Sequence, residues 1–332
     1  MEREARMSRK REIVLVIGYN AAGKTTLVKE FTDAGYHRIN RDELGGTLEQ
    51  QVLHANHALT LHECVVLDNT YATIESRESI VALGKALGIP VRCVWLQTSF
   101  EDAQLNACLR MLQRKGKILM PEEFKKQGPN LFPPVALFSF KNRWENKKKN
   151  QKHPGKQEPK EEHGFSTVEK RKFVRQWPKD HVNKAVLLDY DDTLRCCTGP
   201  QPWPEEQSHI KILPGRKKKL KQLVEQGYIL LGVSNQSGVE KKESPLTHAG
   251  AVALFEHTNK LLGFDIEYQF CPHYRFPVQC YCRKPHCGIG AHFIWKHKLD
   301  PSICIMVGDQ TSDKTFAKRC GFQYEDAEEF FS

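Results

Sequence analysis

Two separate segments of the sequence carry residues suited to phosphate chemistry. Residues 18–25 (GYNAAGKT) have the glycine, lysine and hydroxyl spacing of a P-loop, the loop that binds nucleotide phosphates. Residues 189–193 (DYDDT) place two carboxylates two positions apart, as an aspartyl-phosphate nucleophile site requires. The first site would add phosphate and the second would remove it. A nucleic acid whose ends are phosphorylated and dephosphorylated during repair is the kind of substrate that would need both.

The surroundings of the first segment support a P-loop. An apolar run at 13–18 (IVLVIG) predicts a strand before it, and residues 25–35 (TTLVKEFTDAG) predict a helix after it. The glycines would let backbone N–H groups surround phosphates, and the helix N-terminus would add its dipole. We expect Lys24 to bridge the β- and γ-phosphates of ATP and Thr25 to bind Mg²⁺. The expected ATP-binding residues are Gly18, Gly23, Lys24, Thr25, Thr26, Arg110 and Arg114.

A kinase also needs a group that accepts the proton of the attacking hydroxyl. Asp42 follows a short apolar stretch and is the candidate base; its alternative role is that of a helix N-cap. Asp68 ends the run VVLD and could hold the acceptor or act on Mg²⁺ through water, or it could only close a turn. Arg110 and Arg114 lie four residues apart on a predicted helix and would face a lid together, or remain solvated arginines.

These kinase-type motifs resemble a known family. GYNAAGKTT, INRDELG, VVLDNT and the two lid arginines, in this order, resemble the kinase module of polynucleotide 5′-kinase/3′-phosphatases over residues 12–140. The resemblance implies that Lys24 and Thr25 hold ATP phosphates and Mg²⁺. It also implies that Asp42 activates a 5′-hydroxyl and that Arg114 or Arg110 clamps the donor phosphates.

In the C-terminal half, polar residues follow several predicted strands. Asp189 and Asp191 come after AVLLDY, and two carboxylates at this spacing can divide the work of nucleophile and of acid and base. The strand ends of an open parallel sheet converge on one crevice, so the residues after the other strands should meet them there. These residues are Ser234, Asn235, Lys284, Asp309 and Asp313.

This set resembles the haloacid dehalogenase (HAD) phosphohydrolases. The resemblance implies that Asp189 is the nucleophile, that Asp191 is the acid and base, and that Lys284 contributes to catalysis. Phosphate would be bound by Ser234, Asn235, Arg283 and Lys284. Magnesium would be held by Asp189, Asp191, Asp309 and Asp313.

A compact group of metal-binding residues lies within the same half. Cys271, His273, Cys280 and Cys282 offer three thiolates and one imidazole, enough for a closed tetrahedral zinc site. Such a zinc would be structural and would brace the loop carrying Arg283 and Lys284; the alternative is a loop of thiols without metal. CPH followed by CYCRKP resembles the zinc-loop branch of the HAD family, which includes histidinol-phosphate and heptose bisphosphate phosphatases. The phosphatase half of animal polynucleotide kinases lacks this loop.

Composition bounds the organisation of the 332 residues. The hydrophobic content of 39% is that of a globular protein, no apolar run is long enough for a membrane span, and the charged start does not fit a secretory signal. We expect two α/β domains, the nucleus or cytoplasm as location, and reduced thiols. The expected parts are a basic segment (1–11), a P-loop kinase-like domain (12–140), a charged linker (141–182) and a HAD-type phosphatase domain (183–332).

The formal net charge of +10 favours a polyanionic partner. Basic clusters at 147–149 and 216–219 could follow phosphates, with Trp144 available for stacking, or they could only be solvated surface. The leading hypothesis is an end-healing enzyme acting on DNA or RNA, with ATP, Mg²⁺ and Zn²⁺ as cofactors and a ligase as a further partner. The alternative is a kinase/phosphatase of small sugar or amino-alcohol phosphates, and a third option is a degenerate binding module.

Overall fold

The computed structural model describes residues 11–61, 64–126, 131–134, 158–241, 244–274 and 280–332. The chain divides into two compact units. The first contains Met1–Asn106 and Gly128–Arg175, and the second contains Ala107–Gln127 and Gln176–Ser332.

A five-stranded sheet forms the centre of the first unit, with the order β2-β3-β1-β4-β5 and all neighbours parallel. Strand β1 is buried on both faces, which explains its uninterrupted apolar sequence. The strands are β1 (Glu12–Ile17), β2 (His37–Asn40), β3 (Cys64–Asp68), β4 (Val91–Gln97) and β5 (Thr167–Lys172).

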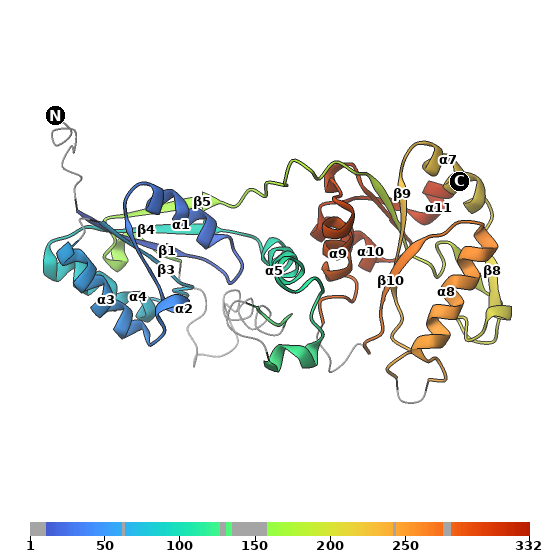
Figure 1. Ribbon diagram of the computed structural model, residues 1–332, viewed down its shortest axis with the longest axis horizontal. Coiled ribbons are helices and arrows are strands. Elements are labelled where there is room, and N and C mark those ends of the chain that lie inside the picture. The colour runs from blue at the N-terminus through green and yellow to red at the C-terminus, as the bar shows by residue number, and fades with distance from the viewer. Residues whose placement is uncertain (1–10, 62–63, 127–130, 135–157, 242–243, 275–279) are drawn as a thin grey trace. The chain divides into compact units, whose positions relative to one another are not determined.

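Helices cover both faces of this sheet. Helix α1 lies on one face, and α3 and α4 lie on the other (Figure 1). Leu27, Val28 and Phe31 of α1 are buried in the core. The helices are α1 (Lys24–Asp33), α2 (Arg41–Leu44), α3 (Leu48–Leu61), α4 (Glu75–Leu87) and the first half of α5 (Phe100–Lys115), with a short 3₁₀ turn at Glu161–His163. The second half of α5 and the 3₁₀ turn at Pro121–Lys126 are grouped with the second unit.

Part of the predicted linker belongs to the first sheet. Residues 167–172 form β5 at the sheet edge, and Phe165 is only 5% exposed in the core. The segment TVEKRK lacks an apolar pattern because its charges have local partners: Glu169 pairs with Arg92 at 3.3 Å, and the Lys170 ammonium lies over the Trp95 ring. The basic cluster at 147–149, Trp144 and all but Arg11 of the predicted N-terminal segment lie outside the described residues.

The second unit contains a further parallel sheet, with the order β10-β9-β6-β11-β12. Its strands are β6 (Ala185–Leu188), β9 (Ile229–Asn235), β10 (Glu267–Cys271), β11 (Ile305–Gly308) and β12 (Gln323–Asp326). After β6 the chain forms an antiparallel hairpin of β7 (Arg195–Cys197) and β8 (Ile210–Ile212). The central strand β6 is fully buried. Asp189 directly follows this strand, so its backbone is held by the core of the sheet.

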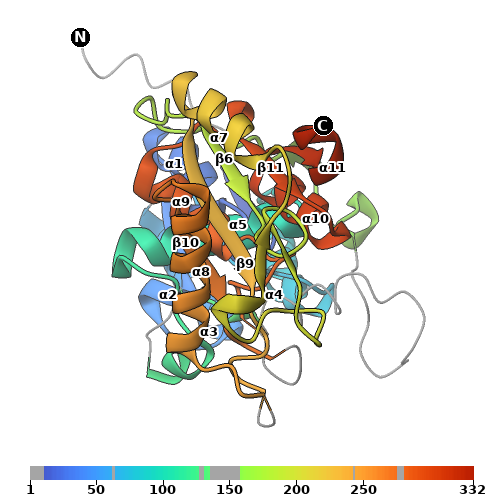
Figure 2. The same ribbon diagram turned by 90° about the vertical axis from the view of Figure 1, so that its right-hand side faces the viewer.

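Helices again lie on both faces of the second sheet. Side chains of α7, α8 and α11 pack in one core with β6 and β9, while α9 and α10 lie on the opposite side of the strands (Figures 1 and 2). These helices are α7 (Arg216–Glu225), α8 (His248–Leu262), α9 (Gly288–His297), α10 (Thr311–Cys320) and α11 (Ala327–Phe331), with 3₁₀ turns at Gln207–His209 and Pro301–Ile303. The predicted architecture of two α/β domains with parallel sheets is confirmed.

None of the helices in the described part of the chain combines the length and the apolar composition that a membrane crossing needs.

Candidate active sites

The P-loop of the first unit connects β1 to α1. Gly23 precedes the helix with φ of 95°, a left-handed conformation that glycine adopts without strain. The Lys24 ammonium donates hydrogen bonds to the carbonyl oxygens of Gly18, at 3.1 Å, and Tyr19, at 2.7 Å. Lys24 therefore folds back over the loop. Thr25 and Thr26 are exposed in the first turn of α1.

The two kinase-type carboxylates occupy different environments. Asn40, not Asp42, caps α2: its Oδ1 accepts hydrogen bonds from the backbone N–H groups of Asp42, at 2.9 Å, and Glu43, at 3.2 Å. The Asp42 side chain is exposed in the first turn of that helix, so the alternative role of Asp42 as the N-cap of α2 is wrong. Asp68 is buried at the end of β3 and pairs with Arg38 at 2.8 Å. Burial raises the pKa of Asp68, and Arg38 opposes that increase.

A contact joins the end of β2, at Asn40, to the end of β3, at Asp68. The side-chain amide of Asn40 donates to the Asp68 carboxylate and, at 3.3 Å, to the Asp68 carbonyl oxygen. Asp68 therefore orients the residue that caps the helix carrying Asp42.

The remaining predicted residues of the first site lie on α5. Asn106, in the first half of α5, donates to the Ala21 carbonyl oxygen of the P-loop at 2.8 Å. Arg110 and Arg114 follow on the half of α5 that is grouped with the second unit. Their assignment to the ATP phosphates stays a prediction.

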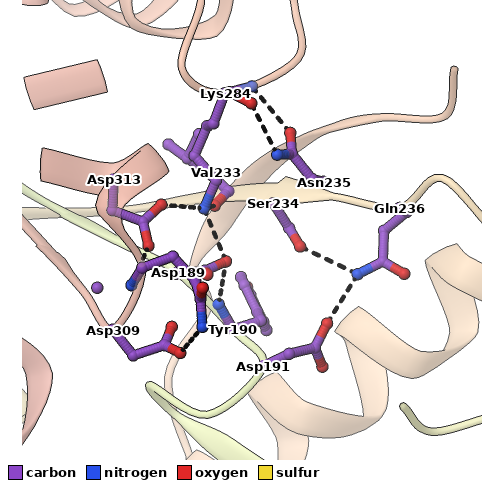
Figure 3. A network of polar contacts seen from close by, with 12 residues as sticks. Asp189, Tyr190, Asp191, Val233, Ser234, Asn235, Gln236, Lys284, Asp309 and Asp313 are labelled. Atoms are coloured by element: carbon purple, nitrogen blue, oxygen red, sulfur yellow. Dashed lines mark hydrogen bonds and ion pairs between the residues drawn. The ribbon is translucent and has the colours of Figure 1, made fainter. Parts of the chain in front are cut away.

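In the second unit, a buried lysine joins two carboxylates. The Lys284 ammonium lies 2.9 Å from Asp189 Oδ1 and 2.7 Å from Asp313 Oδ1, and it donates to the Val233 carbonyl oxygen at 2.8 Å (Figure 3). Lys284 is 3% exposed. Burial raises the pKa of Asp189 to about 7, while Lys284 opposes the increase and Asp313 adds to it.

Three carboxylates in this site could hold a cation. One oxygen each from Asp189, Asp309 and Asp313 lies within 4.8 Å of the others. Asp309 Oδ1 is buried and has no hydrogen-bond partner within the described ranges, so a divalent cation would satisfy it. The set therefore fits Mg²⁺. The carboxylate of Asp191 is not part of this group.

Asp191 contacts two residues to which the sequence motifs assign no role, Arg195 and Gln236. Its Oδ1 pairs with Arg195 Nε at 2.9 Å, and its Oδ2 accepts from Gln236 Nε2 at 2.9 Å. Gln236 also donates to Ser234 Oγ at 3.0 Å. The spacing of an arginine four residues after Asp191 was the available signal for Arg195. Gln236 could have been noticed beside Ser234 in the motif SNQ.

Asn235 uses its side-chain amide on the lysine loop. It donates to the Lys284 carbonyl oxygen at 3.0 Å and accepts from the Lys284 N–H at 2.8 Å. Arg283 is half-buried and donates to the His273 carbonyl oxygen at 3.4 Å. Asn235 therefore holds the backbone of Lys284 in place. The binding of phosphate by Asn235 stays a prediction.

The predicted zinc ligands lie together and are buried. Four pairs among their sulfur atoms and the His273 Nδ1 atom lie at hydrogen-bond distance, 3.2 to 3.6 Å apart. Ligands at bond lengths of roughly 2.0–2.3 Å around tetrahedral zinc would be roughly 3.3–3.8 Å apart. The Nε2 atom of His273 lies 3.9 Å from Glu240, beyond hydrogen-bond distance. Cys271, His273, Cys280 and Cys282 are therefore compatible with zinc.

The chain matches two families and several known proteins. Residues 13–124 match a family described as AAA domain, and residues 184–331 match one described as Polynucleotide kinase 3 phosphatase. The bifunctional polynucleotide phosphatase/kinase of Schizosaccharomyces pombe is 33% identical over 187 residues, which cover 56% of this chain and 37% of that protein. The D-glycero-β-D-manno-heptose-1,7-bisphosphate 7-phosphatase of Haemophilus influenzae is 34% identical over 143 residues, covering 40% of this chain and 74% of that protein.

Residues 184–331 belong to the HAD phosphatase family. The predicted resemblances, to a P-loop kinase module in the first half and to HAD phosphatases in the second, are confirmed by the two family matches. The chain spans only 37% of the length of the fission-yeast relative. A solved D,D-heptose 1,7-bisphosphate phosphatase from B. bronchiseptica, complexed with magnesium and phosphate, aligns with 43% of this chain and 79% of its own, at 21% identity and a TM-score of 0.38. ATP and Mg²⁺ are the usual requirements of the two families.

Proposed function

We propose that this protein heals nucleic acid ends. It transfers the γ-phosphate of ATP to a 5′-hydroxyl and removes a 3′-phosphate through an aspartyl-phosphate intermediate. The observation that carries the proposal is the buried group of Asp189, Lys284 and Asp313 in a domain that matches Polynucleotide kinase 3 phosphatase, in the same chain as a P-loop.

In the phosphatase reaction, an Asp189 oxygen attacks phosphorus as the bond to the leaving oxygen breaks, and Asp191 gives that oxygen a proton. Water then attacks the phosphoaspartate, Asp191 takes a proton from it, and phosphate leaves with Asp189 restored. Lys284, 2.9 Å from Asp189, offsets the repulsion between the carboxylate and the phosphate. The hydroxyl of Ser234 donates to a phosphate oxygen.

Two metals would support this chemistry. Bound by Asp189, Asp309 and Asp313, Mg²⁺ would supply positive charge at the attacked phosphate. Zinc held by the cluster of three cysteines and His273 would be structural, because all four positions are protein ligands. The cluster ends at Cys282, two residues before Lys284, so it fixes the loop that delivers the lysine.

In the kinase reaction, the oxygen of the 5′-hydroxyl attacks the γ-phosphorus of ATP while the exposed Asp42 carboxylate accepts the hydroxyl proton. The bond from the γ-phosphorus to the bridging oxygen of the β-phosphate breaks, and ADP leaves. The Asp68 contact to Asn40 fixes the helix that presents Asp42. Lys24, Thr25 and Thr26 would bind the ATP phosphates and Mg²⁺, and Arg110 or Arg114 would clamp the donor.

Charge and access support a nucleic acid substrate. The chain has a formal net charge of +10, and basic residues begin α7, where Arg216 donates to the Thr193 carbonyl oxygen beside the nucleophile loop at 2.9 Å. Among the described residues that follow Asp191, we find a hairpin and sheet helices but no inserted cap domain. Such a site admits a polymer end. A ligase would act on the healed ends, in the nucleus or cytoplasm.

Two observations favour a second candidate. The second unit has a metal-binding cluster, and the chain matches 74% of the length of a heptose bisphosphate phosphatase, an enzyme whose substrate is a small phosphate ester. Sugar phosphate hydrolysis is therefore the alternative for the second unit.

The test is a gel assay with Mg²⁺, labelled ATP and an oligonucleotide that bears a 5′-hydroxyl and a 3′-phosphate. Lys24→Ala should abolish label transfer alone, and Asp189→Asn should abolish 3′-phosphate release alone. An oligonucleotide left untouched by a wild-type protein that hydrolyses a sugar phosphate would reject end healing.

A further inference from the structure

We propose that Arg195 is a positioning residue that holds the carboxylate of Asp191 in place for both of its proton transfers. This inference rests on the proposed phosphatase reaction. Arg195 is the first residue of β7 and lies outside the motif that carries the nucleophile.

Both oxygens of Asp191 are held by donors. Arg195 Nε lies 2.9 Å from Oδ1, and Gln236 Nε2 donates to Oδ2 at 2.9 Å. Figure 3 shows Gln236 between Asp191 and Ser234, on the side of the site away from Asp309. A carboxylate fixed at both oxygens has little freedom to rotate, and its direction is set by its partners.

Arg195 is itself anchored on α8. Its Nη1 donates to the Leu254 carbonyl oxygen at 2.9 Å and to Thr258 Oγ1 at 2.7 Å. The guanidinium also lies over the rings of Tyr190 and Phe255, at 5.4 and 5.2 Å. The anchors come from a helix about 60 residues later in the chain, so α8 defines where Arg195 can point.

Burial excludes a direct role on the substrate. Arg195 is 1% exposed, and a phosphate ester cannot reach a guanidinium enclosed by aromatic rings and α8. Keeping a buried cation is costly unless it is paired and hydrogen-bonded, and Asp191 is the carboxylate that pairs with it. The residue therefore acts through Asp191.

The two half-reactions respond differently to a misplaced Asp191. In the first, the bond between phosphorus and the leaving oxygen breaks as the bond to Asp189 forms, and an alkoxide leaving group must receive the Asp191 proton. A p-nitrophenolate leaves without a proton. In the second half-reaction, water attacks the phosphoaspartate for every substrate, and Asp191 must accept its proton. Misplacement should thus slow both steps for alkyl phosphates and only the second step for p-nitrophenyl phosphate.

The experiment compares wild-type protein and Arg195→Gln with these two substrates in the presence of Mg²⁺. Loss of orientation should reduce turnover by about 100-fold on both. With p-nitrophenyl phosphate, the variant should release about one equivalent of nitrophenolate per protein in a rapid burst before the slow phase. With glycerol 2-phosphate no burst should occur. Arg195→Lys should restore part of the turnover, because it returns a cation beside Asp191.

Two further variants separate positioning from folding. Thr258→Val removes one anchor of Arg195 and keeps the side-chain size, so it should reduce turnover less than Arg195→Gln while keeping the full burst. Arg92→Gln removes an ion-paired arginine of the first unit and should leave phosphatase turnover unchanged. If Arg195→Gln does not fold, as judged by its melting curve, Thr258→Val decides the question.

The inference fails if burst and turnover fall in the same proportion, since that indicates less active protein. It also fails if both substrates keep wild-type turnover. A wild-type protein that hydrolyses neither substrate would instead reject the proposed phosphatase.

Discussion

The four aspartates of the second site have different partners, and those partners separate their roles. Asp189 and Asp313 share the Lys284 ammonium, Asp191 is held by Arg195 and Gln236, and Asp309 has a buried oxygen without a partner in the described structure. Carboxylates of one chemical type can thus act as nucleophile, proton carrier and cation ligand within one site.

The orphaned oxygen predicts how Asp309 contributes. Asp309→Asn removes one charge from the carboxylate group, so the Mg²⁺ concentration for half-maximal 3′-phosphatase activity should rise at least about 10-fold. A Mg²⁺ titration of wild-type and variant protein measures this. Kinase activity of the same variant is the internal control and should keep its Mg²⁺ dependence. An unchanged phosphatase titration would show that Asp309 is not a ligand.

The raised pKa of Asp189 predicts a pH dependence of stability without metal. The folded site retains a proton up to about pH 7, whereas the unfolded chain releases it near the ordinary value of 3.8. In chelator, the free energy of unfolding should therefore fall as pH rises through this window, by about 1.4 kcal/mol per pH unit from this group. Denaturant titrations of wild-type protein and Asp189→Asn measure the difference. Equal slopes for the two proteins would contradict the assignment.

Most residues of the second site could be predicted from the order of the sequence motifs. Asp189, Lys284, Asp309 and Asp313 were predicted to meet because each follows a strand of a parallel sheet, and the structure brings them together. Arg195 and Gln236 escaped prediction because their importance depends on side-chain direction. For Arg195 it also depends on the distant helix α8.

Among the elements, β5 differs most from what the sequence predicted. Its charges suggested a linker, yet edge strands often carry charges, and here those charges pair with neighbours on β4. Apolar strands such as β1 and β6 were predictable because burial on both faces demands continuous apolar sequence.

Packing of the segment before β5 gives a stability prediction. Phe165 is 5% exposed in the first core, so Phe165→Ala should reduce the free energy of unfolding by about 3–5 kcal/mol. Val174→Ala is the control, because Val174 is 76% exposed and its truncation should cost little. Chemical denaturation followed by kinase activity measures both. Equal stabilities would place Phe165 outside the core.

The metal-binding cluster between β10 and α9 gives a prediction about zinc content and phosphatase activity. Cys282→Ser removes one of the four clustered ligands, so zinc content should fall and the Lys284 loop should loosen. Metal analysis should show less zinc, and 3′-phosphatase turnover should drop at least about 10-fold. Cys196→Ser, a half-buried cysteine outside the cluster, should change neither. Full activity in zinc-free Cys282→Ser would contradict a bracing role.

For the whole molecule, a P-loop in the first unit and a carboxylate–lysine site in the second are what the proposed successive work on one substrate requires. The sequence predicted the two parallel sheets because each motif lies in its own strand–loop–helix context. Substrate choice was not predictable in the same way, since P-loop and HAD chemistry are shared by polymers and small esters. Surface charge and access decide between them, and both depend on the folded surface.

The most direct test of end healing is the specificity constant of the phosphatase for two competing substrates. Purified protein with Mg²⁺ is given a 3′-phosphorylated oligonucleotide and a heptose bisphosphate, and kcat/KM is measured for each at low and high salt. End healing predicts at least about 100-fold preference for the oligonucleotide, and this preference should fall as salt rises because phosphate contacts are screened. A preference for the sugar phosphate that does not change with salt would contradict it.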